Sequence, residues 1–549
     1  MTQNGYLRNI VTEALHKTSY DNDERLTFEK PKLEVHGDAT TNIAMALGKK
    51  LKKNPRAIAQ ELVSALTFDP HIIEKIEIAG PGFINFTFTN EFFCNQLREI
   101  LDAGGNFGKT ASGSGKKAQV EYVSANPTGP LSVGHGRQAA IGDTIANLLQ
   151  WIGYDVTREY YYNNAGRQMR VLAESTYARY RQLFDPSFPF PEDGYQGDYI
   201  RTIAEGLKQE RGDSLLAMNN DDALTICKAF AEEKLFISIR TVLAKMRVHH
   251  DVFYNEDSLY KEGKIQEVID ELRKRNLVYE KDGALWFKAT ELGLEQDRVI
   301  VKSTGEPTYR LPDIAYHREK FRRGFDLIVD IFGADHIATF PDVLAALKAL
   351  GYDADKVKVV IHQFVTLLRD GEQVKMSKRL ANFVTLDELI DEVGPDAVRF
   401  FFLMRSISSH LEFDLNLAKE QSEKNPVYYV QYAHARIASI IRFAQREGMS
   451  LESKEIEYSL LTIASEVALI KLLLNFPDVV ESTALAFEPH RITTYLHDVA
   501  EAFHKFYQES RVVIQDKKLS SARLALCTAT KIVIANGCSI LGITAPEQM

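Results

Sequence analysis

The sequence predicts an α/β protein whose central domain is built on a doubly wound parallel sheet, with an α+β domain before it and an all-α bundle after it. Three observations lead to this prediction. Strand-like apolar runs alternate with helical patterns across residues 117–382, which is typical of parallel sheets. Helix and strand patterns are mixed in residues 1–110, whereas long amphipathic helices with short breaks fill residues 425–549. A chain of 549 residues is long enough for three or four domains.

Composition excludes several classes of protein. Hydrophobic residues make up 45% and charged residues 26% of the chain, as in ordinary globular proteins. Without a long apolar run or a signal-peptide start, we expect a cytoplasmic protein that binds no membrane. The net charge of −9 argues mildly against a nucleic-acid partner, unless basic residues gather locally. The cysteines form no CxxC pair, so we expect neither a zinc site nor a disulfide framework; they are Cys94, Cys227, Cys527 and Cys538.

The N-terminal domain combines helical patterns with a strand alternation in residues 73–88. Its basic run at residues 49–56 is explained equally well by a cationic binding surface and by a solvated helix end. Residues 103–110 resemble a Walker A phosphate-binding loop, but Ala103 replaces the first glycine and a helical run precedes it. We therefore interpret this segment as the end of a helix followed by a linker.

Residues 118–143 contain the first stretch that points to chemistry. A strand pattern is broken by Asn-Pro-Thr-Gly-Pro at residues 126–130, and helical spacing begins near Gly134. The N–H groups at the start of a helix can bind phosphate, and His135 adds a hydrogen-bond donor there. Such turns between strands and helices are common, so this stretch alone is only suggestive.

A second stretch, Val-Lys-Met-Ser-Lys-Arg at residues 374–379, strengthens the first. It follows a strand-like run at residues 356–368 and an Asp370-Gly371 turn. Two lysines and an arginine within five residues suit a loop that binds a triphosphate, although a solvated charged turn explains the isolated motif equally well. The two motifs rarely occur together in this order.

Together the motifs resemble the His-Ile-Gly-His and Lys-Met-Ser-Lys-Ser signatures of class I aminoacyl-tRNA synthetases. Four further segments are similar to the arginyl-tRNA synthetase family, and the resemblance covers essentially the whole chain; the segments are residues 120–143, 194–200, 307–317 and 427–437. The first histidine of the signature is replaced by Ser132, which has a shorter reach and stays neutral. A histidine there is therefore expected to speed adenylate formation.

The resemblance implies four domains. We expect a tRNA-binding domain at residues 1–110 and a Rossmann-like catalytic domain at 117–382. The catalytic domain is expected to carry a mostly helical insertion at about residues 165–296 and to resume at Val-Ile-Val-Lys-Ser-Thr. A helical bridge at 383–424 would lead to an anticodon-binding domain at 425–549.

An arginine pocket needs carboxylates that can pair in fork geometry with a guanidinium. The resemblance implies that Glu256 and Asp313 do so, with Tyr309 one helical turn before Asp313. It places Glu121 and Asn126 near the α-amino group of the substrate. Either Asp335 or His336 is expected to form a further wall of the pocket, and the sequence does not decide between them.

For the nucleotide, the resemblance implies binding of ATP with its Mg²⁺, and no metal held by the protein alone. In-line attack of the arginine carboxylate on ATP requires alignment and charge stabilisation. The catalytic residues would be His135, Lys375, Ser377 and Lys378. The ATP-binding set would be Asn126, Pro127, Thr128, Gly129, Pro130, Leu131, Ser132, Val133, Gly134, His135, Lys375, Met376 and Lys378.

The implied partners are L-arginine and tRNA(Arg), bound by a monomer, with tRNA required before arginine is activated. Phe83 and Asn85 would contact the tRNA elbow, although strand core explains Phe83 as well. Tyr428, Tyr432 and Arg436 form an aromatic and basic stripe that suits stacking of anticodon bases, although such stripes are more often core.

Two alternative functions fit the sequence less well. Ser132 would favour a weakened relative that only binds tRNA, but the intact His135, Lys375 and Lys378 argue against it. A nucleotidyltransferase that acts on small molecules would need neither the N-terminal domain nor the Tyr-rich bundle.

Overall fold

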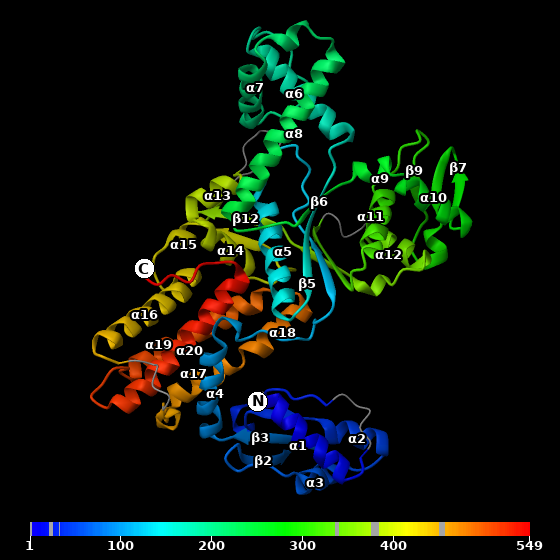
Figure 1. Cartoon of the computed structure of the whole chain (residues 1–549). Coiled ribbons are helices and arrows are strands. Elements are labelled where there is room, and N and C mark those ends of the chain that lie inside the picture. Colours follow the sequence, from blue (N-terminus) through cyan, green and yellow to red (C-terminus); the bar gives the residue numbers. More distant parts are fainter. Residues whose placement is uncertain (1–2, 21–25, 32, 335–339, 375–383, 450–455) are drawn as a thin grey trace.

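The computed structural model describes the whole chain except residues 1–2, 21–25, 32, 335–339, 375–383 and 450–455 (Figure 1). The N-terminal domain is a three-stranded antiparallel sheet in the order β1–β3–β2, covered by helices. The strands are β1 (Ala39–Thr41), β2 (Ile73–Ala79) and β3 (Phe83–Phe88), and the helices are α1 (Gln3–Lys17), α2 (Ile43–Leu51) and α3 (Pro55–Ala65).

Helix α4 (Asn90–Ala103) leaves this domain and packs against the C-terminal bundle. It ends in a short 3₁₀ turn, Gly104–Asn106, whose backbone is bound by the bundle residue Asn536. The Asn536 amide donates to the carbonyls of Gly104 and Phe107, both at 2.9 Å. Because no strand directly precedes residues 103–110, their interpretation as a helix end and linker is confirmed.

The central sheet has the order β11–β10–β4–β5–β6, and each neighbouring pair is parallel, which confirms the predicted fold class. The chain leaves β4 toward β5 on one side and returns through β10 on the other, so β4 lies at the point where the strand order reverses. The strands are β4 (Lys117–Glu121), β5 (Asp155–Tyr162), β6 (Val252–Asn255), β10 (Leu327–Gly333) and β11 (Val357–His362). Helix α5 (Val133–Trp151), which follows β4, is buried almost all round.

Three helices between β5 and β6 form a projection that we term the helical arm (residues 166–245). It consists of α6 (Gly166–Gln182), α7 (Asp198–Arg211) and α8 (Asn220–Lys245). Figure 1 shows α6 and α7 projecting away from the central sheet, with α8 running back toward it. The range 165–296, expected to be a mostly helical insertion, also contains β6, which is a strand of the central sheet.

A small antiparallel sheet, in the order β7–β8–β9, follows β6. Its last strand contains Val299–Val301, so the expectation that the nucleotide fold resumes at Val-Ile-Val-Lys-Ser-Thr is wrong. An apolar run indicates a strand but does not say which strand is its partner. The elements of this lobe are α9 (Asp257–Lys261), α10 (Lys264–Lys274), β7 (Val278–Lys281), β8 (Ala284–Phe287), β9 (Arg298–Val301), α11 (Arg310–Arg322) and α12 (Phe340–Ala349).

The run predicted at residues 356–368 forms two strands in two different sheets. The first part is β11 of the central sheet, and the second is β12 (Val365–Arg369), which pairs with β13 (Glu372–Gln373) and β14 (Leu411–Asp414). The predicted turn is confirmed, because Asp370 and Gly371 have φ of 54° and 79° between the antiparallel β12 and β13. Residues 375–379 lie outside the described part of the chain.

A bridge of α13 (Leu386–Val393), α14 (Pro395–Leu403) and α15 (Leu415–Lys419) leads to the helical bundle. Helix α20 is long and apolar enough to cross a membrane, contrary to the expectation that the chain has no long apolar run. Because 72% of its most apolar window is buried inside the protein, α20 is the core helix of the bundle. The bundle helices are α16 (Pro426–Arg446), α17 (Ala464–Leu474), α18 (Phe476–Ala486), α19 (His490–Glu509) and α20 (Lys517–Leu541).

A fully buried arginine joins the bridge to three other helices. The Arg399 guanidinium of α14 donates to Asp143 Oδ2 of α5 at 2.5 Å. It also donates to the carbonyls of Leu541, at the end of α20, and Met246, just after α8, at 2.7 and 2.8 Å. Gly542 has φ of 67°, and a Cβ there would lie 2.3 Å from Arg399 Nη2, so the arginine requires glycine at this position.

We expect Arg399→Met to lower the free energy of unfolding by about 3–5 kcal/mol, because the buried Asp143 would lose its closest partner and keep only the more distant Arg158, whose Nε lies 3.7 Å away. The control is Arg369→Met, which removes an arginine paired with Glu392 at the surface and should cost at most about 1 kcal/mol. Thermal unfolding midpoints of the two variants provide the comparison. Equal midpoints would contradict the role assigned to Arg399.

Candidate active site

A cavity of about 770 Å³ opens at the carboxyl ends of the central strands. This is where open parallel sheets bind their ligands. Nine of the residues predicted from the sequence line it: Glu121, Asn126, Ser132, Val133, Gly134, His135, Glu256, Tyr309 and Asp313. Of these, Tyr309 is 81% exposed, so its ring stands free at the wall of the cavity.

The backbone turns sharply where β4 ends. Val123 and Ser124 have φ of 71° and 43°, a conformation that is unfavourable for a β-branched residue such as valine. The Ser124 hydroxyl donates to Glu121 Oε1 at 3.0 Å and accepts the N–H of Tyr161 at 3.1 Å. These bonds stabilise the turn, which sends the chain into residues 126–131, a segment that we term the signature loop.

Helix α5 begins with a reciprocal cap between Ser132 and His135. The N–H of Ser132 donates to His135 Nδ1 at 3.1 Å, while the Ser132 hydroxyl accepts the N–H of His135 at 3.5 Å. Because Nδ1 accepts a hydrogen bond, the neutral ring carries its proton on Nε2. The cap thus fixes the orientation of the His135 ring, which lines the cavity.

Glu256 lies at one end of the cavity, just after β6, and is 8% exposed. Burial raises the pKa of its carboxyl, and hydrogen bonds from its neighbours partly offset that effect. Tyr161 and Asn163 donate to it at 2.8 Å each, and Tyr260 donates at 3.4 Å. The carboxylate is therefore held in one orientation before any ligand binds.

Asp313 faces the same cavity from α11. Among the described residues, its carboxyl oxygens have no hydrogen-bonding or ion-pairing partner. Burial raises the pKa of Asp313 to about 7, an effect that His317 opposes and the nearby Glu121 and Glu256 reinforce. Two acids side by side, one of them unpaired, form a site for a cation.

Behind these acids lies a buried ionic cluster. Lys320 Nζ lies 2.6 Å from Glu121 Oε2 and 2.5 Å from Asp330 Oδ1. The two ring nitrogens of His317 face acceptors, Asp330 Oδ2 and the Asp313 carbonyl, each at 2.8 Å. Burial alone would raise the pKa of Asp330, but Lys320 and His317 hold it well below its usual range. His317 thus links the backbone of α11 to Asp330 of the central sheet.

Sequence reasoning missed this cluster and the residues around Glu256. Asp313, His317 and Lys320 recur at three- to four-residue spacing in α11, a polar stripe on a helix that is otherwise apolar on its buried side. That spacing could have predicted the cluster from the sequence. Tyr161 and Asn163, at the end of β5, were harder to predict as neighbours of Glu256, because aromatic residues are common in strands.

Several predicted residues do not line the cavity. Leu131 is 2% exposed, and its carbonyl accepts the N–H of Leu386, so this residue belongs to the core rather than to an ATP site. Pro127, Thr128, Gly129 and Pro130 are likewise absent from the described cavity wall. The predicted Lys375, Met376, Ser377, Lys378, Asp335 and His336 lie outside the residues that the structure describes.

The predicted tRNA-binding residues lie on two surfaces. In β3, Phe83 is half-buried, but Asn85 is only 5% exposed, because this middle strand is flanked on both sides; its amide is not available at the surface. On α16, Tyr428 stacks on Tyr432 with ring centroids 6.1 Å apart, and the Arg436 guanidinium lies 5.7 Å from the Tyr432 ring. All three are half-buried.

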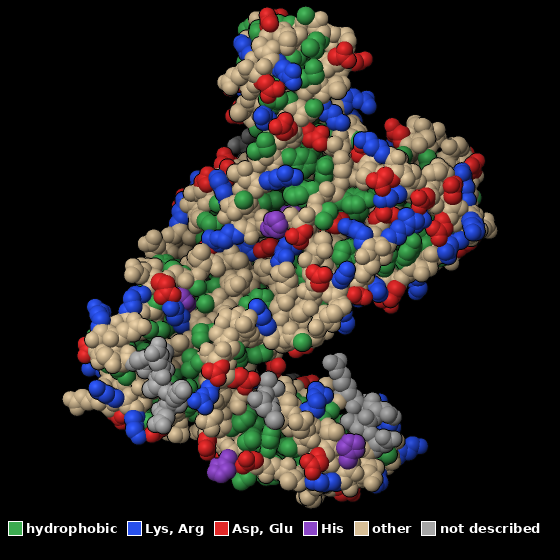
Figure 2. Space-filling view, in the orientation of Figure 1, with side chains coloured by type: hydrophobic (Ala, Val, Ile, Leu, Met, Phe, Trp, Pro, Cys, Tyr) green, Lys and Arg blue, Asp and Glu red, His purple; other side chains and the backbone are tan. Residues whose placement is uncertain are grey.

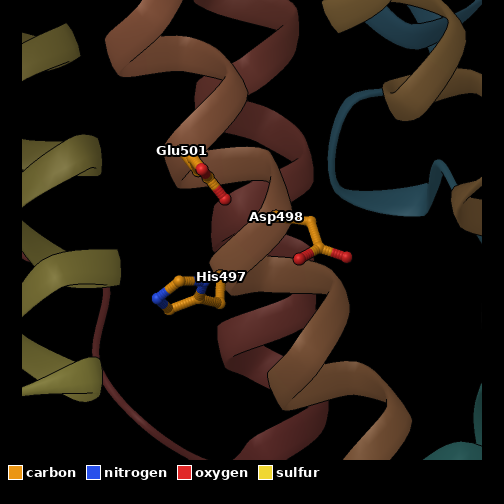
Figure 3. Close-up of side chains that lie close together, drawn as sticks. All are labelled: His497, Asp498 and Glu501. Atoms are coloured by element: carbon orange, nitrogen blue, oxygen red, sulfur yellow. The ribbon is translucent and has the colours of Figure 1, made fainter.

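One further group of side chains on α19 could be considered for metal binding (Figure 3). His497, Asp498 and Glu501 are exposed, with one potential ligand atom from each lying within 4.8 Å of the others. The His497 ring packs against Tyr429 at 5.1 Å. Residues one helical turn apart approach one another without an ion, so we assign no metal to this group.

Three families match successive parts of the chain. Residues 5–88 match the arginyl tRNA synthetase N terminal domain, and residues 96–402 match the catalytic domain of class I (R) tRNA synthetases. Residues 430–549 match the DALR anticodon binding domain.

Known proteins are similar over nearly the full length. An arginine–tRNA ligase of Desulfotalea psychrophila is 54% identical over 96% of this chain and 95% of that protein. One of Salinibacter ruber is 51% identical over 99% of this chain and 100% of that protein. The arginyl-tRNA synthetase structure of Thermus thermophilus has a TM-score of 0.78 at 24% identity, over 100% of both chains, and shows the same fold. The chain therefore belongs to the arginine–tRNA ligase family of class I aminoacyl-tRNA synthetases.

Proposed function

We propose that the protein charges tRNA(Arg) with L-arginine at the expense of ATP. The arginine carboxylate attacks the α-phosphorus of ATP, which gives arginyl-adenylate and releases pyrophosphate. The ribose of the terminal adenosine of the tRNA then attacks the adenylate and releases AMP. The observation that carries this proposal is the single cavity that joins a pair of acids, Glu256 and Asp313, to the N-terminus of α5.

The acid pair gives the cavity its specificity in this proposal. Glu256 is already held by three donors, whereas Asp313 is available to pair with a guanidinium. Tyr309 would cover the side chain of the substrate, and Glu121 and Asn126 would receive its α-amino group. A neutral or shorter side chain would leave the Asp313 carboxyl buried without a partner, which is why arginine is preferred.

For the ATP step, we propose that the start of α5 and His135, which lines the cavity, bind the phosphates and ribose. Lys375 and Lys378 would neutralise the pyrophosphate as it leaves, with Ser377 and Met376 shaping that loop. Mg²⁺ accompanying ATP would be held mainly by the phosphates. These groups form no covalent bond to the substrates; they lower the activation barrier of adenylate formation by aligning the substrates and stabilising charge.

We further propose that residues 1–110 and 425–549 bind the elbow and anticodon of the tRNA, beside the catalytic residues 117–382 and the bridge 383–424. Phe83 and the stacked Tyr428, Tyr432 and Arg436 are the proposed contacts. Figure 2 shows acidic and basic side chains interspersed over the visible face, so this face does not present a continuous cationic surface. We also propose that the protein acts in the cytoplasm, as a monomer.

The direct test is arginine-dependent exchange between ATP and pyrophosphate, with and without tRNA(Arg). The proposal predicts exchange that requires both arginine and the tRNA. Exchange with another amino acid in place of arginine would overturn it.

Asp313→Asn should raise the KM for arginine about a hundredfold or more, because loss of one partner of a buried charge pair costs about 3–5 kcal/mol. The control is Glu306→Gln, which removes a carboxylate that is 72% exposed and pairs with Lys302. Steady-state aminoacylation provides both values. An unchanged KM in the Asp313 variant would remove this residue from the pocket.

Arginine affinity should increase as the pH rises from 6 to 8. The pKa of Asp313 is about 7 in the free protein, and its carboxyl must lose a proton before it pairs with a guanidinium. The Kd should fall toward tenfold per pH unit below 7 and level off above it. Calorimetry in buffers of different ionisation enthalpy would detect the released proton, and a Kd that is constant across this range would contradict the expectation.

The cap at Ser132 changes what we expect of this position. Ser132→Ala removes the hydroxyl that accepts the His135 N–H, and adenylate formation should slow about fivefold, as for a lost cap of about 1 kcal/mol. Ser132→Thr keeps the hydroxyl and should retain the rate. Ser132→His lacks it and should not exceed the wild-type rate, contrary to the expectation from the signature. Single-turnover adenylate formation with tRNA present compares all three.

A further inference from the structure

The helical arm contacts the signature loop directly. The Tyr199 hydroxyl, at the start of α7, donates to the Thr128 carbonyl at 2.8 Å. The tyrosine also lies against Gly129, where an added Cβ would come within 3.1 Å of the hydroxyl oxygen. Because proline flanks this stretch on both sides, its backbone has few N–H groups with which to hold itself. Tyr199 thus supplies a fixed point from outside the loop.

A second contact orients the first residue of the loop. Asn126 Nδ2 donates to Gln168 Oε1 of α6 at 3.0 Å, and Asn126 Oδ1 accepts the N–H of Asn163 at 2.9 Å. The first contact uses one of the two hydrogens of the Asn126 amide, and the second uses one of the two lone pairs of its oxygen. One donor and one acceptor site of Asn126 therefore remain for a ligand, in a direction set by the arm.

The far end of α8 is tied to the other side of the site. Lys245 Nζ lies 2.6 Å from Asp387 and 3.0 Å from Asp391, both on α13. The N–H of Leu386, the first residue of α13, donates to the Leu131 carbonyl at 2.9 Å. The arm, the signature loop and α13 therefore form a closed ring of contacts around the start of α5.

We propose that Tyr199 and Gln168 are positioning residues for the signature loop, through which the helical arm sets the geometry of the ATP and arginine sites. This inference rests on the proposed function. Tyr199 would act on the loop that leads into the α5 N-terminus, where the nucleotide is proposed to bind. Gln168 would act on Asn126, beside the α-amino group of the substrate.

The first test compares Tyr199→Phe with Tyr195→Phe. Tyr195 lies in the same arm, is also half-buried, and its hydroxyl has no partner among the described residues. We expect Tyr199→Phe to lower kcat/KM for ATP in pyrophosphate exchange about fivefold, while the thermal midpoint and the Kd for arginine stay within error. Hydrogen–deuterium exchange of residues 124–134 should become faster in this variant alone.

The second test uses the exposed Gln168, where a substitution does not threaten folding. Gln168→Met removes the acceptor for Asn126 and should raise the KM for arginine about fivefold, with little change in kcat or in the KM for ATP. Gln168→Glu keeps an acceptor oxygen and should restore the wild-type KM.

These outcomes separate the inference from the proposed function. If the wild-type protein shows no arginine-dependent exchange, the proposed function fails. If the wild type is active while Tyr199→Phe matches Tyr195→Phe in kinetics and loop exchange, the inference about Tyr199 is overturned. Equal KM values for arginine in the methionine and glutamate variants would overturn the inference about Gln168.

Discussion

The active site depends on how the buried charges of α11 are balanced. Lys320 faces both Glu121 and Asp330 at hydrogen-bonding distance, and His317 faces Asp330, so these two carboxylates have partners without help from a ligand. Glu256 and Asp313 remain outside this balance, on the side of the cavity. Such charges are costly to bury unless they are paired, and in our proposal the guanidinium of the substrate completes the part of the balance that the protein leaves open.

Much of this arrangement could be predicted from the sequence, because it rests on local patterns. The strand, loop and helix at residues 118–143 and the position of Asp313 one turn after Tyr309 follow from periodicity and turn chemistry. The partner of a strand cannot be predicted in this way. For this reason β9 and the second half of the run at 356–368, which forms β12, were expected in the central sheet but belong to other sheets. Periodicity describes which face is apolar, whereas pairing depends on contacts between distant segments.

The side-chain network was hidden for the same reason. Ser132 was interpreted through the ligand that a histidine would contact, while the structure gives it a local role as a helix cap. Lys320 and Asp330 lie ten residues apart on different elements and meet only when α11 packs on the sheet. The contact between Tyr199 and Thr128 joins residues 71 positions apart, so no local pattern could reveal it.

Helix α4 has a consequence for the proposed tRNA-binding surfaces. It begins directly after the N-terminal sheet but packs along the bundle, where Asn536 binds the backbone at its end. A second link joins the two domains, because Lys471 of the bundle helix α17 pairs with Asp38 of the N-terminal domain at 2.6 Å. The surface that carries Phe83 is thereby braced against the domain that carries Tyr432, rather than against the catalytic sheet. The two proposed surfaces are therefore held at a fixed distance from each other. An RNA with a longer or shorter distance between elbow and anticodon could contact only one of them.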